Sequence, residues 1–129
     1  ILYLFYISSI AEDIVKFWDD PYKFVIYAFP WGEPGTPLDH YIGPDKWQRE
    51  LLQHITTEIR KGNESAIQFA VTSGHGVGKS SMTSWIILWY ISTRPNPQIL
   101  ITANTMQQLS TKTWRELSKW HQLAINRDW

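Results

Sequence analysis

Residues 66–80 read Ala66-Ile67-Gln68-Phe69-Ala70-Val71-Thr72-Ser73-Gly74-His75-Gly76-Val77-Gly78-Lys79-Ser80. The first six residues form a short apolar run, which is typical of a buried strand. The last eight match the phosphate-binding pattern Gly-x-x-x-x-Gly-Lys-Ser/Thr, except that Ser73 replaces the first glycine. We therefore predict a strand, a phosphate loop and a helix in succession.

The residue types in this loop suit a densely anionic triphosphate. Glycines let successive backbone N–H groups point inward as an anion nest, and the following helix directs its positive end at the phosphates. Lys79 is predicted to reach the β- and γ-phosphates as a mobile positive charge, and Ser80 is the predicted Mg²⁺ ligand. The predicted ATP-binding residues are Ser73, Gly74, His75, Gly76, Val77, Gly78, Lys79 and Ser80. The alternative is a glycine-rich turn followed by a solvated lysine.

The order of elements after residue 65 predicts the fold class. Residues 81–93 are apolar on nearly every side from Trp85 onward, and a phosphate loop must be followed by a helix, so we expect a deeply buried helix there. Residues 98–103 are a second strand candidate. A last helix is expected to place Met106, Leu109, Thr113, Leu117 and Trp120 on one face, with Lys112, Arg115, Glu116 and Lys119 in water. Strand, helix, strand, helix predicts an α/β fold with a parallel sheet flanked by helices.

Two helices and one strand are expected before the loop. Residues 10–20 place Ile10, Ile14, Phe17 and Trp18 on one helical face, and Pro21 then interrupts. Residues 24–29 are apolar and aromatic and predict a short strand, before the turn-rich residues 30–37. A further helix begins near Gly43-Pro44-Asp45, carries Trp47, Leu51, Ile55 and Ile59 at spacings of four, and ends at Gly62-Asn63.

Composition narrows the function classes. The chain has 129 residues, about one domain, and its 12 basic and 12 acidic residues give a formal net charge of zero. A domain that binds nucleic acid by itself is usually basic, so we do not expect this chain to provide the main nucleic-acid-binding surface. There are no cysteines, which excludes disulfides and thiol catalysis. The apolar run 1–10 is shorter than the roughly 20 residues of a membrane span, so we expect it to be buried or covered by a partner and predict no membrane association.

Four blocks of the sequence together resemble the N-terminal part of phage terminase large subunits. They are Phe29-Pro30-Trp31-Gly32-Glu33-Pro34-Gly35-Thr36-Pro37-Leu38, Gly43-Pro44-Asp45-Lys46-Trp47-Gln48-Arg49-Glu50, the loop 73–80, and Thr102-Ala103-Asn104-Thr105. The resemblance implies an ATPase domain of the additional-strand (ASCE) type, akin to helicase and RecA-like motors. It also implies that Trp47 and Gln48 contact adenine, since an aromatic ring can stack on the base and an amide can both donate to it and accept from it.

The same resemblance implies a function in packaging viral DNA. Residues 1–43 would be a helical and loop lead-in, and residues 44–129 the first part of the P-loop ATPase domain. Lys79 would be the catalytic residue, because its charge would stabilise the transferring phosphoryl group, and the implied cofactors are ATP and Mg²⁺. The implied partners are double-stranded DNA, the small terminase subunit, the portal protein and further copies in a ring, in the cytoplasm of a bacterial host.

The acidic Walker B strand, the coupling motif and the RNase H-like nuclease domain of that family are absent from these 129 residues. We therefore expect this chain to bind nucleotide weakly and not to hydrolyse it at a useful rate. Two alternatives stay open: another P-loop motor, such as a helicase or AAA-type ATPase, and a truncated prophage remnant with an inactive nucleotide site.

Overall fold

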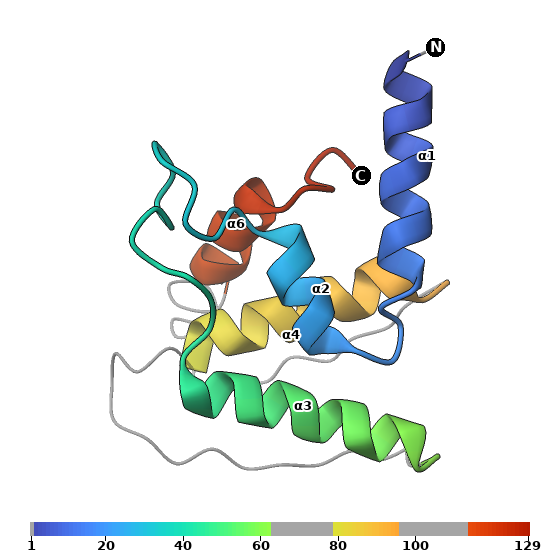
Figure 1. Ribbon diagram of the computed structural model, residues 1–129, viewed down its shortest axis with the longest axis vertical. Helices are drawn as coiled ribbons and strands as arrows, with labels where there is room; N and C mark the ends of the chain where they lie inside the picture. Colours follow the sequence, from blue (N-terminus) through green and yellow to red (C-terminus); the bar gives the residue numbers. More distant parts are fainter. Residues whose placement is uncertain (1, 63–78, 96–113) are drawn as a thin grey trace.

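The computed structural model describes residues 2–62, 79–95 and 114–129, and every regular element in these ranges is a helix (Figure 1). The helices are α1 (Leu2–Val15), α2 (Pro21–Ala28), α3 (Lys46–Arg60), α4 (Lys79–Thr93) and α6 (Trp114–Leu123). The predicted α/β fold with a parallel sheet, of the ASCE or RecA-like P-loop type, is therefore wrong for the part of the chain that the structure describes. The predicted strands at 66–71 and 98–103 lie outside the described residues.

The strand predicted at residues 24–29 is also wrong, because these residues belong to α2. The Asp20 carboxylate accepts a hydrogen bond from the backbone N–H of Lys23 at 3.1 Å and so caps the helix. Pro21 does not interrupt a helix but occupies the first turn of one, where its missing N–H costs nothing. Phe24, Val25 and Ala28 are buried on one side of α2. A short apolar run fits a strand or a buried helix equally well, and here the cap favours the helix.

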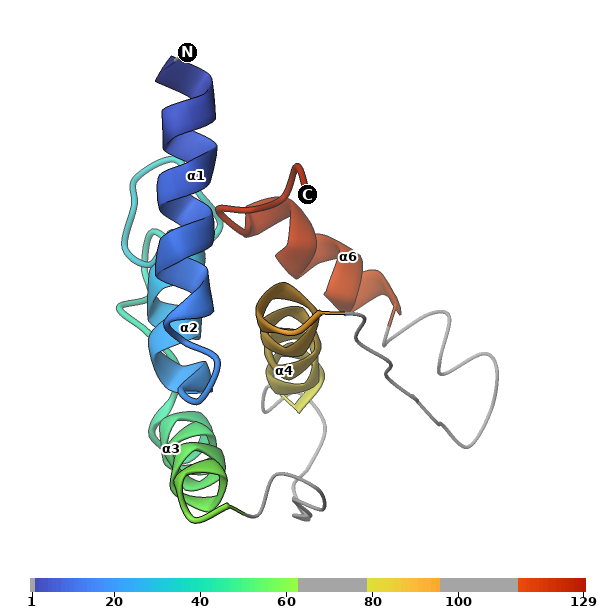
Figure 2. The same ribbon diagram turned by 90° about the vertical axis from the view of Figure 1, so that its right-hand side faces the viewer.

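Helix α4 lies at the centre of the described part of the chain. It contacts α1 and α2 on one side and α6 on the other, and Figure 2 shows it end-on between them. A helix in that position must be apolar on most sides, which explains the near-continuous apolar run after Trp85. Its buried side chains are Met82, Ser84, Trp85, Ile87, Leu88 and Trp89. The helix predicted after the glycine-rich loop is thus confirmed.

Helix α3 confirms the helix predicted after Gly43-Pro44-Asp45. It buries Leu52, Ile55 and Ile59, and it packs against α2. Asp45 is its N-cap, so Pro44 precedes the helix. At the other end Gly62 has φ of +87°, a left-handed conformation that glycine adopts without steric cost. The predicted end at Gly62-Asn63 therefore has a direct structural reason.

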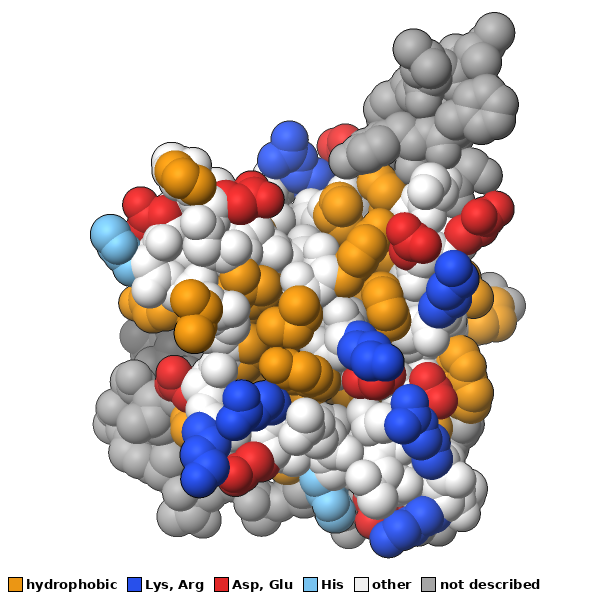
Figure 3. Space-filling view, viewed as in Figure 1, with side chains coloured by type: hydrophobic (Ala, Val, Ile, Leu, Met, Phe, Trp, Pro, Cys, Tyr) orange, Lys and Arg blue, Asp and Glu red, His pale blue; other side chains and the backbone are white. Residues whose placement is uncertain are grey.

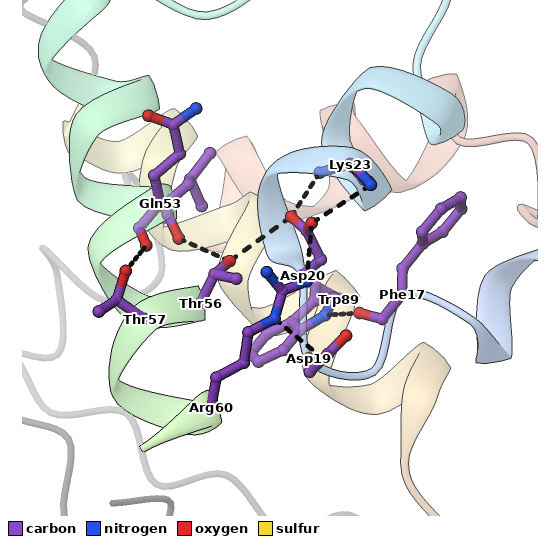
Figure 4. A network of polar contacts seen from close by, with 10 residues as sticks. Phe17, Asp19, Asp20, Lys23, Gln53, Thr56, Thr57, Arg60 and Trp89 are labelled. Carbon is purple, nitrogen blue, oxygen red and sulfur yellow. Dashed lines mark hydrogen bonds and ion pairs between the residues drawn. The ribbon is translucent and has the colours of Figure 1, made fainter. Parts of the chain in front are cut away.

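A polar network fastens the α1–α2 corner to α3 (Figure 4). Asp20 accepts a hydrogen bond from Thr56 Oγ1 at 3.5 Å and pairs with Arg60 Nη2 at 3.6 Å. Arg60 Nε also donates to Asp19 Oδ2 at 3.2 Å. Because Asp20 is only 8% exposed, these contacts satisfy a carboxylate that burial would otherwise penalise.

The turn-rich segment after α2 folds back over α4. Trp31 Nε1 donates to the main-chain oxygen of Val25 at 2.9 Å, and Gly32 N donates to Leu38 O at 2.9 Å. Gly32 has φ of +72°, so glycine suits this turn. The Trp31 ring then meets Trp85 of α4 at 5.8 Å between ring centroids. These contacts place the segment beside the candidate site.

The upper part of α1 extends beyond the other helices (Figures 1 and 2), although Ile10 and Ile14 in its lower part are buried. On the face drawn in Figure 3, apolar side chains gather across the middle and charged side chains surround them. Within the part of the chain that the structure describes, no helix has the combined length and apolar character that a membrane crossing needs. The side chains of residues 1–8 lie outside the described part.

Candidate nucleotide-binding site

The structure places only the end of the predicted phosphate loop. Residues Ser73, Gly74, His75, Gly76, Val77 and Gly78 lie outside the described residues, as does the side chain of Lys79. The backbone of Lys79 begins α4, and Ser80 follows it in the first turn with an exposed side chain. Ser84 Oγ donates to the Ser80 main-chain oxygen at 2.9 Å, which supports this turn. The roles of the loop residues therefore stay predictions.

A pocket of about 300 Å³ lies beside this first turn of α4. Three parts of the chain enclose it: the segment 31–48, α4 and α6. It is lined by Trp31, Pro37, Leu38, Tyr41, Gly43, Pro44, Asp45, Gln48, Ser81, Trp85, Lys119 and Trp120. Its volume is at the lower end of the roughly 300–1,000 Å³ that small-molecule sites occupy, which is enough for a planar ring system.

Gln48 lines the pocket, whereas Trp47 does not. Gln48 is 4% exposed, and its Oε1 accepts a hydrogen bond from the backbone N–H of Asp45 at 2.9 Å. This bond is half of a capping box and holds the amide in one orientation at the start of α3. Trp47 is half-buried and packs against the hydrophobic core. Gln48 therefore lies at the pocket and Trp47 at the core, and the adenine contact that the resemblance implies for both residues stays a prediction.

Aromatic rings from three elements form one side of the pocket. Trp85 and Trp120 meet edge to face with 5.2 Å between their centroids, and Trp31 lies 6.0 Å from Trp120. Trp85 and Trp120 are 2% and 4% exposed, so α4 and α6 hold them firmly. Edge-to-face pairs of this kind add to the stability that burial alone provides.

Besides Asp45 and Gln48 at the start of α3, the pocket has polar side chains from α4 and α6. Ser81 of α4 donates through Oγ to Glu116 Oε2 at 3.2 Å, and Trp120 Nε1 donates to the same oxygen at 3.1 Å. Lys119 Nζ lies 4.0 Å from Glu116 Oε1 and 5.5 Å from the Trp120 ring centroid. A single carboxylate therefore contacts three of the residues that line the pocket.

Sequence reasoning missed several of these residues. Tyr41 had no assigned role, Trp120 was assigned to a core face, and Trp31 entered only through the family resemblance. Glu116 was expected in water, but its side chain is 28% exposed and accepts two hydrogen bonds, so that expectation is wrong. The spacing of four between Glu116 and Trp120 on a helix was a signal that could have indicated their contact.

The arrangement suits a flat heteroaromatic ligand. Indole and phenol rings offer stacking surfaces, and the amide of Gln48 and the hydroxyl of Ser81 offer hydrogen bonds that set orientation. The pocket adjoins the residues that directly follow the glycine-rich loop.

Part of the chain is similar to a phage terminase. An 81-residue stretch is 36% identical to a protein named probable terminase, large subunit, from Enterobacteria phage P7. This stretch makes up 63% of the present chain and 15% of the phage protein. The match supports the terminase resemblance over that stretch. No family model matches the chain, and no solved structure matches it.

Proposed function

We propose that this chain binds ATP and supplies nucleotide-binding residues to a phage DNA-packaging motor. The observation that carries the proposal is that Gln48 and Ser81 line one pocket. Gln48 is the amide assigned to adenine, and Ser81 belongs to the helical turn that directly follows the glycine-rich loop. The proposal is supported by this shared pocket, because Gln48 and Ser81 are 33 residues apart in the sequence and Ser81 directly follows the predicted Mg²⁺ ligand Ser80.

The residues present fit such a ligand. The base would occupy the aromatic pocket, with Trp31 and Tyr41 as stacking surfaces and the Gln48 amide toward its edge. The phosphates would be held by residues 73–79, and Lys79 would neutralise their charge. Bound Mg²⁺ would neutralise further phosphate charge, and Ser80, exposed in the first turn of α4, is the hydroxyl that would hold it.

The packaging function rests on the similarity to the phage protein. The matched stretch covers only 15% of that protein. The activity and partners below are therefore proposed for a whole protein that contains such a stretch. We propose that this protein couples ATP hydrolysis to translocation of double-stranded DNA in the bacterial cytoplasm. It would work with a small terminase subunit, a portal protein and further copies of itself in a ring.

A binding titration tests the proposal. The full chain is titrated with a fluorescent ATP analogue in the presence of Mg²⁺, with tryptophan emission as the energy-transfer donor. We expect saturable binding that unlabelled ATP competes away and that Lys79→Ala weakens at least about tenfold, since a charge-assisted phosphate contact is lost. The matched control is Lys46→Ala, whose side chain is 80% exposed on α3. Equal binding by the unmodified chain and Lys79→Ala would contradict the proposal.

A further inference from the structure

We infer that Glu116 is a positioning residue for the nucleotide pocket. Its carboxylate holds the first turn of α4 against α6 and so maintains the shape of the pocket. This inference rests on the proposed function, because it concerns the same pocket. Glu116 itself does not line the pocket. It acts through Ser81, Lys119 and Trp120, which do.

The contacts of Glu116 join the two helices at the pocket. Its Oε2 accepts from Ser81 Oγ at 3.2 Å, across the interface, and from Trp120 Nε1 at 3.1 Å, within α6. Lys119 pairs with its other oxygen at 4.0 Å. A carboxylate can accept several hydrogen bonds at once, and bonds to a charged acceptor are stronger than neutral ones.

The loss of this carboxylate would leave a buried donor without its partner. Trp120 is 4% exposed, so without Glu116 its Nε1 could donate a hydrogen bond to water only if the ring moved. Movement of the Trp120 ring would change the pocket wall directly, because this ring also contacts Trp31 and Trp85. The effect of Glu116 on the ligand is therefore indirect but specific to the pocket.

Other bonds hold the far end of α6. Ile125 N donates to Ala28 O at 2.8 Å, and Asn126 Nδ2 donates to Ser92 Oγ at 3.0 Å. These contacts lie beyond the C-terminal end of α6, whereas Glu116 lies in its first turn. Helix α6 is thus held at both ends, and beside the pocket Glu116 adds a hydrogen bond between α4 and α6 to the packing of Trp85 against Trp120. A ligand that contacts Ser81 and Trp120 would therefore contact the two residues through which Glu116 joins α4 to α6.

The test combines three variants of the full chain with the fluorescent ATP analogue and Mg²⁺. We expect Glu116→Ala to weaken binding about tenfold, and Glu116→Gln to restore it to within about threefold because an amide oxygen still accepts both hydrogen bonds. Ser81→Ala removes the bond between helices and is expected to weaken binding about threefold. The matched control, Glu50→Ala, removes an exposed glutamate of α3 that pairs with Lys46, and should leave affinity unchanged.

A second readout follows the indole N–H of Trp120 by NMR. In the unmodified chain we expect the ATP analogue to shift this resonance, and in Glu116→Ala we expect the shift to disappear. If the unmodified chain binds and Glu116→Ala binds with equal affinity, the inference is overturned while the proposed function stands. If the unmodified chain does not bind the ATP analogue, the proposed function and this inference are both overturned. If Glu116→Ala does not fold, Ser81→Ala decides, and unchanged affinity there overturns the inference.

Discussion

Trp89 Nε1 of α4 donates a hydrogen bond of 2.6 Å to the main-chain oxygen of Phe17. Phe17 lies just after α1, so this bond fastens the central helix to the N-terminal part of the chain. Arg94 covers the same indole, with its guanidinium carbon 4.5 Å from the ring centroid. Trp89 is 4% exposed, and water therefore cannot easily replace the bond.

Two tryptophans of α4 should respond differently to replacement by phenylalanine. Trp89→Phe removes the indole donor to the oxygen of Phe17, which still accepts a hydrogen bond from Asp20 N at 3.0 Å, and should lower the free energy of unfolding by about 1.5 kcal/mol. Trp85 is equally buried, but its Nε1 has no hydrogen-bond partner among the described residues. Trp85→Phe removes an unpaired donor and should cost about 1 kcal/mol less. Urea unfolding of both variants measures the difference, and equal losses would contradict this account.

Asp20 should matter more as a helix cap than as an ion-pair partner. Asp20→Ala removes the hydrogen bond to Lys23 N and should lower the free energy of unfolding by about 1–2 kcal/mol. Asp20→Asn retains a side-chain acceptor and loses only the charge, so we expect a smaller loss. The pairing with Arg60, whose side chain is 58% exposed, should contribute less than about 1 kcal/mol and should weaken with added salt.

Thermal unfolding at low and high NaCl separates the two contributions of Asp20. The loss in Asp20→Ala should persist at high salt, because a cap hydrogen bond is short-ranged. The loss in Arg60→Ala should shrink as the salt concentration rises. An Asn variant as unstable as the Ala variant would show that the charge, and not the cap, dominates.

Gly62 should be intolerant of a side chain. Its φ of +87° places it in the left-handed region, so Gly62→Ala should destabilise the chain by roughly 1–2 kcal/mol. Gly43→Ala is the matched control, because a Cβ there would lie 3.5 Å from Ile26 Cδ1, an ordinary van der Waals contact. We expect that control to change stability by less than about 0.5 kcal/mol. Chemical denaturation of the two variants provides the measurement.

Gln48 should set the choice of base under the proposed function. Gln48→Ala removes the amide from the pocket and should reduce the preference for ATP over GTP about tenfold, as judged by competition titrations. The ratio of the two affinities is informative because the loss of the capping bond to Asp45 would affect both nucleotides alike. Gln53→Ala, at an exposed position of the same helix, is the control. An unchanged ratio in Gln48→Ala would exclude base reading by this residue.

The correct sequence predictions depend on neighbouring residues. Helix α3 begins after its N-cap Asp45 and ends before Gly62, which adopts a left-handed conformation. Both features can be read from a few neighbouring residues. The strand prediction at residues 24–29 is wrong because a short apolar run fits a strand or a helix, and the Asp20 cap selects the helix. The predicted parallel sheet rested on the runs at 66–71 and 98–103, which lie outside the described residues, whereas every regular element in the described ranges is a helix.

The sequence by itself determined the helix that begins at Lys79 and the limits of α3. Helix caps, glycine conformations and helical periodicity act over a few residues, so the order of amino acids is enough to indicate them. Only the tertiary structure decided which side chains share the pocket. Gln48, Ser81 and Trp120 line it together because α4 packs against α6, and α2 connects α3 to α4 through one hydrophobic core. The contact between Glu116 and Ser81 depends on that packing as well, because it joins helices that are far apart in sequence.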